Sequence, residues 1–345
     1  MLLTKMTGPA HEVETTYEPH RNLITGVTNR SLTQHAERVA GAQQRQRHEG
    51  TKGSVVSSYA YSNDVLGRRE TISQGGEAFG MLKLGENNIE VAYNDRSEVV
   101  GATTRRGDTT VAQHEYAYDA IGNRRSFASE GRSQDSEVRT EKVSYETNAL
   151  NQYTAIKERS SSNPKSEIGN PQFDPDGNLL EDARNTYTWN ADNNLVRVDA
   201  KDGTVRLDYV YDHQSRRTVR TEIRHPGTKN EEQRSTFYLY DDWNLLAEIE
   251  AHPTDGELET SNFKPATLYS WGCDLSGSLQ GAGGVGGLLA ISEELKVGES
   301  GPLDRDDLAR GYRHRFPAYD ANGNVGQLLD ESGKTVAAHA LSLIH

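Results

Sequence analysis

The most frequent hydrophobic pattern in the chain is a pair of aromatic residues two positions apart, usually followed by Asp, Asn or Gly. Side chains at positions i and i+2 lie on one face of an extended strand, whereas a helix separates them by about 200°. The pattern therefore predicts strands that carry rings on one face. The clearest pairs are Tyr59 with Tyr61, Tyr116 with Tyr118, Tyr187 with Trp189, Tyr209 with Tyr211, Tyr238 with Tyr240, and Tyr269 with Trp271.

Polar turn residues and a second apolar run follow most of these pairs. Asn and Gly in the segments 121–123, 176–178 and 322–324 tolerate the left-handed backbone of tight hairpins. Apolar positions then resume, as at 179–180 and 195–198. Each unit is therefore predicted to be a β-hairpin. Weaker copies begin at Tyr93, Tyr145, Phe173 and Tyr319.

The repetition predicts an all-β fold in which tandem antiparallel β-hairpins form a curved or spiral sheet. The array covers residues 51–338, after a partly irregular N-terminal edge segment (1–50) and before a divergent tail (339–345). Residues 31–50 lack period-two alternation, which leaves a helix or loose chain open there. Four polar stretches are predicted as loops at hairpin ends: 129–141, 158–170, 224–234 and 251–262.

Composition narrows the function classes. Only 34% of the residues are hydrophobic, which suits thin sheets that are wet on one side. The net charge of −13 disfavours nucleic acid as a partner, because such binding relies on clustered Lys and Arg. The single cysteine excludes an internal disulfide framework. We expect no membrane span, since no run approaches about 18 apolar residues, and no signal peptide within this chain.

Several motifs together resemble the YD repeats of bacterial RHS proteins, which are related in architecture to Tc-toxin C components and teneurins. The residues that carry the resemblance are Tyr17–Asn29, Tyr93–Val99, Asn148–Tyr153 and Trp271–Gly281. The last segment is the most specific, because it resembles the C-terminal RHS repeat-associated core. The resemblance covers the chain from Tyr17 to about Ala338.

The resemblance implies a spiral of strands that wraps into a hollow shell and, in toxin-bearing relatives, encloses a C-terminal effector. Such relatives carry a closing Tyr-Asp-Pro-x-Gly motif, which in several groups supports self-cleavage by nearby aspartates. This chain instead runs from His339 to His345, so we expect it to lack that motif and the effector. The resemblance thus predicts a non-catalytic fragment of an RHS toxin or surface protein, secreted or at the cell surface in an intact relative.

The glycine-rich end of the core motif also matches a dinucleotide-binding pattern, since Gly281, Gly283 and Gly286 spell GxGxxG. No alternation of strands and helices surrounds it, and Gly287 and Leu288 replace the Lys and Ser/Thr of a P-loop. We expect a tight backbone crossing and no cofactor. The predicted core-motif residues are Asp274, Gly277, Gly281, Gly283, Gly286 and Gly287.

Alternating oxygen side chains could suggest calcium, as at Asp174, Asp176 and Asn178. An EF-hand loop needs glycine at its sixth position and glutamate at its twelfth. Here Gly177 is fourth and Asn185 is twelfth. We therefore expect these side chains to cap their own turns, and we predict no metal site.

The search for catalytic groups gives no candidate residues, and no enzyme is predicted. Asp241 and Asp242 are adjacent, as are Asp306 and Asp307, so each pair points to opposite strand faces. Cys273 lies inside the core motif without a visible histidine partner, and we interpret it as a small shell residue.

Paired arginines follow three of the turns and leave an alternative function open. They are Arg68-Arg69, Arg124-Arg125 and Arg216-Arg217. A recurring basic pair could bind acidic glycans, and exposed rings stack on sugars, which would make the chain a carbohydrate-binding or adhesion module. The simpler interpretation is pairing with neighbouring Glu and Asp on the wet face.

Overall fold

The computed structural model describes residues 4–32, 53–81, 85–132, 138–160, 166–169, 171–251, 265–295 and 311–339. Within these ranges the predicted all-β, antiparallel architecture is confirmed. The elements are β1 (Lys5–Thr7), β2 (His11–Tyr17), β3 (Ile24–Ser31), β4 (Val55–Asn63), β5 (Arg69–Gly75), α1 (Glu77–Met81), β6 (Asn87–Tyr93), β7 (Val99–Arg106), β8 (Thr109–Tyr118), β9 (Arg124–Arg132), β10 (Val138–Thr147), β11 (Tyr153–Ser160), β12 (Ser166–Gly169), β13 (Gln172–Phe173), β14 (Leu179–Glu181), β15 (Asn185–Trp189), β16 (Leu195–Ala200), β17 (Val205–Tyr211), β18 (Arg217–Arg224), β19 (Glu232–Asp241), β20 (Asn244–Ala251), β21 (Pro265–Trp271), β22 (Leu288–Glu294), β23 (Tyr312–Tyr319), β24 (Val325–Leu329) and β25 (Thr335–Ala338).

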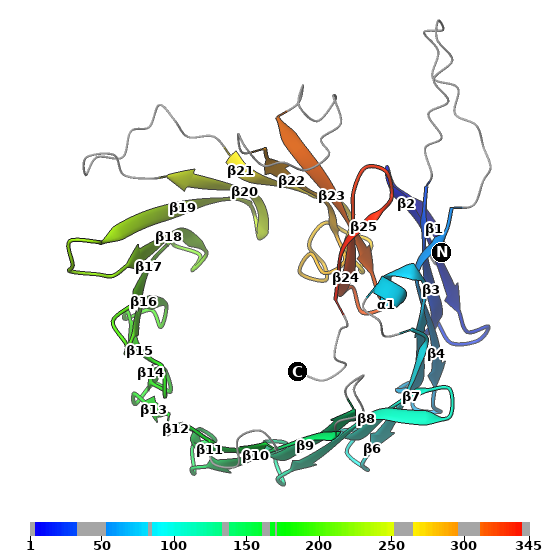
Figure 1. The fold of residues 1–345 in the computed structure, drawn as a ribbon, viewed down its shortest axis with the longest axis horizontal. Helices are drawn as coiled ribbons and strands as arrows, with labels where there is room; N and C mark the ends of the chain where they lie inside the picture. The colour runs from blue at the N-terminus through cyan, green and yellow to red at the C-terminus, as the bar shows by residue number, and fades with distance from the viewer. Residues whose placement is uncertain are drawn as a thin grey trace, which may run out of the picture. The chain divides into compact units, whose positions relative to one another are not determined.

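Strand order follows chain order, through β1–β12 in one sheet and β13–β25 in the other (Figure 1). Neighbours in sequence are neighbours in the sheet because most connections are short turns, which is the geometry of repeated hairpins. None of the described helical residues forms a segment long and apolar enough to cross a membrane.

Three of the four predicted loops are partly wrong. The stretch 224–234 includes Arg224 of β18 and the first three residues of β19. The stretch 158–170 contains β12, which pairs with β11, and the stretch 129–141 contains the ends of β9 and β10. These residues are polar, but a sheet with one solvent-exposed face accepts polar side chains as long as the backbone hydrogen bonds between its strands are formed. Of the predicted loop 251–262, only Ala251 lies inside the described residues, and it ends β20.

Register is interrupted at the same place in successive hairpins. A β-bulge precedes the second aromatic residue, so that Tyr118 lies opposite Arg124, Tyr211 opposite Arg217 and Tyr319 opposite Val325. A bulge bends the strand and redirects the side chain that follows it. The second aromatic side chain is thereby placed differently from the first, although both lie on the same strand.

The chain divides into two compact units, which we describe separately. The first comprises Met1–Glu90, Thr104–Thr109 and Tyr269–His345, and the second comprises Val91–Thr103 and Thr110–Leu268. The predicted boundaries at residues 50 and 338 remain predictions. Of the irregular segment predicted at 31–50, residues 33–50 lie outside the described ranges, and Ser31 ends β3.

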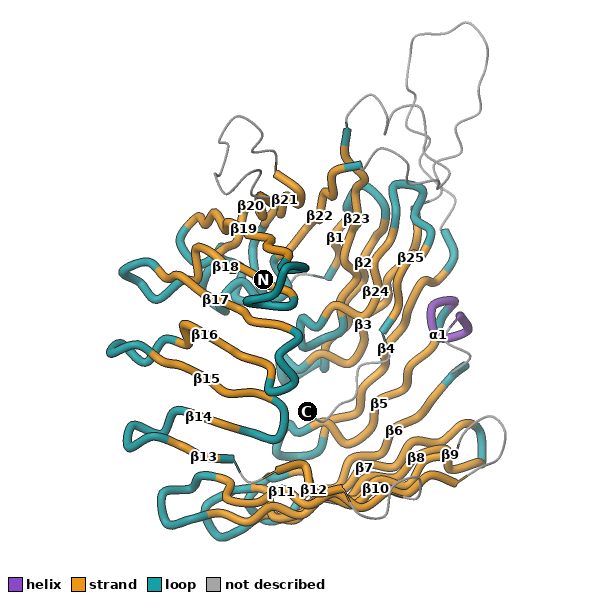
Figure 2. Tube along the Cα trace, turned by 60° about the vertical axis from the view of Figure 1, so that its left-hand side comes forward, coloured by secondary structure: helices purple, strands orange, loops and turns teal. Residues whose placement is uncertain are grey.

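The first unit has a closed core. Its core cluster joins Val56 on β4, Ala78 on α1, and Ala318 and Leu329 from β23 and β24, all at most 1% exposed. Figures 1 and 2 show β24 and β25 beside β2, β3 and the helix. A C-terminal group of three strands therefore forms a second layer on an N-terminal sheet.

Helix α1 was not anticipated from the sequence. It spans five residues and follows Gly76, whose φ of 105° favours glycine. A Cβ at Gly76 would lie 2.7 Å from the Val56 carbonyl oxygen, so the close approach to β4 also requires glycine. Phe79 is buried, and its ring meets the ring of Tyr59 edge-on at 5.9 Å. The consecutive glycines before Glu77 were the available signal.

The second unit is thinner. Within it, β15–β18 lie side by side as one layer of strands (Figure 2). Large apolar side chains on its strands remain open to solvent, such as Val210 at 56% and Leu239 at 52% exposure. Its buried apolar residues are Ala102, Tyr116, Val143, Ala155, Tyr238, Ala247 and Ala251.

Candidate functional site

All the predicted repeat aromatics lie on strands. Tyr59 and Tyr61 are on β4, and their ring centroids are 6.5 Å apart with planes only 6° from parallel, as residues on one strand face should be. The first ring of several pairs is the more buried one, with Tyr116 and Tyr238 at 6% and 8% exposure. The remaining pairs lie on β8, β15, β17, β19 and β21.

The second aromatic residue fastens its hairpin to the preceding one. Tyr118 Oη donates to the Val99 carbonyl at 3.0 Å, and Tyr211 Oη donates to that of Leu195 at 2.8 Å. In both, the acceptor lies five residues after the Asp or Asn that opens the preceding turn. The same relation holds for Trp189 Nε1 with Leu179 (2.7 Å) and for Tyr240 Oη with Arg217 (3.0 Å). The second aromatic ring therefore sets the register between successive hairpins.

The Asp or Asn that opens each turn organises its backbone. Asp119 Oδ1 accepts hydrogen bonds from the backbone amides of Ile121 and Asn123, at 3.0 and 2.9 Å. Gly122 between them has a φ of 94°, in the region that favours glycine. The same pair of amide bonds, to the second and fourth residues after the acceptor, recurs at Asp64, Asn94, Asn148, Asp174, Asn190, Asp212, Asp320 and Asp330.

The other atom of that side chain forms a second bond, which we call the turn lock. Where the turn opens with Asp, the residue four positions later is a donor: Asn123 Nδ2 reaches Asp119 Oδ2 at 2.9 Å, and Arg216 Nε reaches Asp212 Oδ2 at 2.8 Å. In the turn that opens with Asn94 the roles are reversed, and Glu98 accepts from Asn94 Nδ2 at 2.6 Å. Further locks are Arg68–Asp64, Asn178–Asp174, Asn324–Asp320 and Asn148–Gln152.

In two of these turns the lock favours the ionised form of the aspartate. The hydrogen bond from the Asn123 side chain holds the pKa of Asp119 below its ordinary value, and the Asn178 side chain does the same for the pKa of Asp174. Both Asp174 carboxylate oxygens accept from groups of the same turn. The alternating oxygens that resemble a calcium loop are thus engaged as turn caps. Among the described residues, no group of three or more His, Cys, Asp or Glu side chains is arranged to hold a metal.

Side chains also connect successive turns in the second unit. Arg96 donates to the carbonyls of Asp119 and Ala120 at 2.6 and 2.5 Å. Asn178 donates to Asn193 Oδ1 at 2.8 Å, and further contacts join Asn123 to Asn151, Asn194 to Ser215, and Arg216 to the Asp242 carbonyl. The turns therefore stabilise one another along this part of the sheet.

The arginine pairs are engaged with turn aspartates and with tyrosine rings. The first members, Arg68 and Arg216, lock Asp64 and Asp212, each as an i,i+4 pair rather than across strands. Arg69 lies over the Tyr61 ring, 3.9 Å from its centroid, and Arg217 lies over the rings of Tyr209 and Tyr238.

The third arginine pair is offset by one position from the other two. Asn123 locks this turn, and Arg124 therefore takes the place over the ring, 5.2 Å from the Tyr116 centroid. The three pairs are not equivalent, although each follows a turn. Sequence spacing alone had suggested equivalence.

The core motif folds around Asp274. Its Oδ1 accepts from the Ser276 amide (2.8 Å), and its Oδ2 accepts from the amides of Ala282 and Gly284 (2.6 and 3.2 Å). Burial opposes ionisation, yet the bonds from the Ser276 hydroxyl and these amides lower the pKa of Asp274 to about 2. This buried carboxylate pins the glycine-rich segment to the turn.

The core-motif glycines permit close backbone approach. Gly277, Gly283 and Gly286 have φ between 66° and 79°. A Cβ at Gly281 would lie 2.4 Å from Ser276 Oγ, and one at Gly287 would lie 3.1 Å from the Gly272 carbonyl. The tract leads into β22, a strand, whereas a dinucleotide site places pyrophosphate at a helix N-terminus. The geometry is that of a backbone crossing.

One combination of chemical groups was missed by sequence reasoning. Ser292 Oγ on β22 lies 2.7 Å from His314 Nδ1 on β23, and His314 Nε2 lies 3.7 Å from Glu331 Oε1. Ser292 is 8% exposed and is the direct cross-strand partner of His314. We interpret the contact as a tie between strands. Cys273 is exposed, and the predicted pair Asp306 and Asp307 lies outside the described residues.

A polar seam joins the two layers of the first unit and also escaped prediction. Asn29 Nδ2 donates to the Tyr319 carbonyl at 3.0 Å, and Tyr61 Oη accepts from the Ala321 amide at 3.1 Å. Gln327 Nε2 donates to Tyr59 Oη at 3.3 Å. These contacts span up to 290 residues of sequence, which no local pattern reveals.

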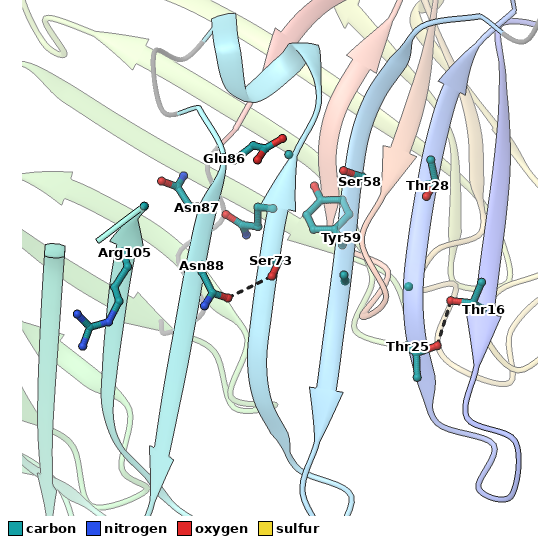
Figure 3. Close-up of a pocket in the computed structure, with 15 residues that line it drawn as sticks. Thr16, Thr25, Thr28, Ser58, Tyr59, Ser73, Glu86, Asn87, Asn88 and Arg105 are labelled. Carbon is teal, nitrogen blue, oxygen red and sulfur yellow. Dashed lines mark hydrogen bonds between the residues drawn. The ribbon is translucent and has the colours of Figure 1, made fainter. Parts of the chain in front are cut away.

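The opposite face of this N-terminal sheet holds a shallow cavity of about 590 Å³ (Figure 3). Its floor is formed by small cross-strand neighbours, including Thr28 with Ser58 and Ser58 with Gly75. The Ser73 hydroxyl bonds Asn88 there at 3.1 Å. Small polar side chains offer little apolar area for a ligand, so this surface is the wet face of the sheet.

Comparison with known proteins agrees with this architecture. A family profile described as Teneurin YD-shell matches residues 69–246, more than half of the chain. The tRNA3(Ser)-specific nuclease WapA of Bacillus spizizenii is 27% identical over 226 residues, which cover 65% of this chain and 7% of WapA. The tRNA nuclease WapA of Bacillus subtilis is 26% identical over the same length. The chain thus spans about 7% of the length of these relatives.

Among solved structures, the crystal structure of TcdB2-TccC3-TEV is similar to this chain, with 12% sequence identity and a TM-score of 0.40. The match covers 96% of this chain and 17% of the chain in that crystal structure. The sequence resemblance to YD-repeat proteins is confirmed by the family match. Repeated hairpins with ring couplings and turn locks fall within the matched residues. The chain belongs to the teneurin YD-shell family.

Proposed function

We propose that this chain is a non-catalytic wall segment of a YD-repeat shell, which in the intact protein encloses a C-terminal effector. The observation that carries the proposal is a repeated coupling, in which four hairpins are each bonded to the hairpin before them. Tyr118, Trp189, Tyr211 and Tyr240 all use their polar atom to hold the preceding strand. Together with the turn locks, these bonds show that the recurring aromatic and turn residues form contacts within the wall.

The nuclease relatives support a division of labour. Their matched segments make up only 7% of each protein. We assign the matched segment to the wall and any effector activity to another part of the intact protein. An effector carrier acts on other cells or outside its own, so we also propose a secreted or cell-surface location.

The carbohydrate-binding alternative receives less support. Arg69, Arg124 and Arg217 lie over tyrosine rings, while Arg68 and Arg216 hold turn aspartates. Groups engaged in this way would have to leave their partners to bind an acidic glycan. Glycan binding therefore remains a prediction from the sequence alone.

Limited proteolysis of the native gene product that contains this chain tests the proposal. If the chain is a wall, the region C-terminal to it should survive proteinase K for longer than the same region produced alone. The triple variant Tyr118→Ala, Tyr211→Ala, Tyr240→Ala removes three couplings and should abolish the protection. The control triple variant Val210→Ala, Leu239→Ala, Leu246→Ala changes exposed side chains and should retain it. Equal digestion of protected and isolated regions, or a gene product with no further region, would contradict the container role.

A further inference from the structure

The closure of the first unit by its C-terminal strands contains a buried histidine. His11 on β2 is 7% exposed, and neither ring nitrogen has a hydrogen-bond partner among the described residues. A buried polar group without a partner is destabilising, and a buried charge without a partner is much more so. The ring is therefore tolerated only while it is neutral.

The geometry places His11 under the β24–β25 turn. Its cross-strand partner on β3 is Ser31, so both side chains lie on the same face of the sheet. A Cβ at Gly333, in that turn, would lie 3.1 Å from Ser31 Cβ and 2.9 Å from the Ala10 carbonyl. Gly333 has a φ of 79°, and this contact explains further why glycine is needed. The turn thus covers the sheet on both sides of His11.

We propose that His11 makes this closure acid-sensitive, so that protonation of its buried ring releases β24 and β25 from β2 and β3. The polar seam favours such an opening, whereas the apolar packing of Leu329 opposes it. The seam is formed in part by Asn29 and Gln327, and Asn29 Oδ1 and Gln327 Oε1 have no partner among the described residues. Separating the layers lets water satisfy these atoms.

Among the described residues, the charged groups around His11 provide no counter-ion. On its own strand, Glu12 pairs with Lys5 of β1, and Glu14 lies near Arg30 of β3; alternation places both glutamates on the opposite face. The β24–β25 turn contains three further charged residues, Asp330, Glu331 and Lys334. Asp330 accepts amides of its own turn, and Glu331 lies near His314.

The sign of the pH effect follows from burial. Burial alone lowers the pKa of His11 from 6.5 to about 4. A lowered histidine pKa means that the closed form is stable above pH 6.5 and loses stability as the pH falls toward 4. Between pH 7.5 and pH 5 the opening equilibrium should rise about 30-fold.

Hydrogen–deuterium exchange of the full chain at pH 7.5 and pH 5 measures this opening, after correction for the intrinsic pH dependence of exchange. Protection of β24 and β25 should fall about 30-fold in the wild type, while β17–β19 in the second unit should change little. His11→Gln, which is neutral at both pH values, should remove the difference. The control variant His314→Gln, at a histidine on β23, should keep it. Equal protection at both pH values, or an unchanged response in His11→Gln, would overturn the proposal.

A second measurement uses the wild type alone, in case His11→Gln fails to fold. Slow deuterium exchange at the imidazole carbon, followed by mass spectrometry, gives the pKa of individual histidines. His11 should titrate well below the ordinary histidine value and exchange slowly because it is buried. An ordinary titration near 6.5 would refute the acid-sensitive closure.

Discussion

The two units solve the problem of covering a strand face in different ways. In the first, Val56 and Leu329 are buried because strands from opposite ends of the sequence pack into two layers. In the second, a buried ring such as Tyr116 rests on Phe127 across its own hairpin, with centroids 5.3 Å apart. The short-range contacts of a YD repeat therefore suffice to build a wall of strands. A core also needs a second layer, which comes from a distant part of the sequence.

The largest expected difference concerns apolar truncation. Leu329→Ala removes a fully buried side chain of the first unit and should destabilise it by about 3 kcal/mol, from lost burial and the cavity left behind. Leu246→Ala in the second unit truncates a side chain that is 40% exposed, and should change stability by less than about 0.5 kcal/mol. Hydrogen exchange measured along a urea titration gives the stability of each unit separately, because the exchanging amides can be assigned to one unit or the other. Similar effects at both sites would show that the second unit has a core of its own.

Removal of one ring hydroxyl comes next in size. Tyr319 Oη donates to the Leu288 carbonyl at 2.6 Å in the first unit, and Tyr240 Oη to the Arg217 carbonyl in the second. Tyr319→Phe should lower stability by about 2 kcal/mol and Tyr240→Phe by about 1 kcal/mol, because an unpaired carbonyl is costlier where water cannot reach it. The midpoints of urea unfolding would check this order, and a larger loss for Tyr240→Phe would reverse the assigned roles.

The turn locks permit a double-mutant cycle. Asn123→Glu sets two carboxylates against each other at Asp119 and should destabilise the hairpin by about 1 kcal/mol. Adding Asp119→Asn recreates the pair seen at Asn94 and Glu98, and should restore most of the loss. Thermal melts of the two single variants and the double variant supply the coupling energy. Additive losses would mean that the lock contributes no specific stability.

Backbone conformation gives the smallest effect. Asp242 has a φ of 52°, which is strained for a residue with a Cβ, so Asp242→Gly should stabilise the second unit by about 0.5 kcal/mol. Gly122→Ala, at a φ of 94°, should destabilise it by about 1 kcal/mol. Both shifts are measurable as changes in melting temperature. Opposite signs would indicate that these turns relax on substitution.

The rings, turns and family were readable from the sequence because their geometry is local. Strand alternation places Tyr59 beside Tyr61, and an Asp or Asn with a flexible residue three positions later defines the turn. The lock rule was also visible in principle, since each donor or acceptor lies four residues from its partner. It was missed because Arg124-Arg125 resembles the other arginine pairs, although Asn123 holds that turn.

Only tertiary structure decided which hairpins meet face to face. Nothing near Asn29 or His11 in sequence indicates that Tyr319 and Gly333 lie against them. Any strand with a solvent-exposed face could have packed against the C-terminal strands. Helix α1 depends on the same packing, since five residues are too few to form a stable helix alone. The sequence thus determined the repeating wall through contacts within a few residues, and the long-range fold selected where the first unit acquires its core.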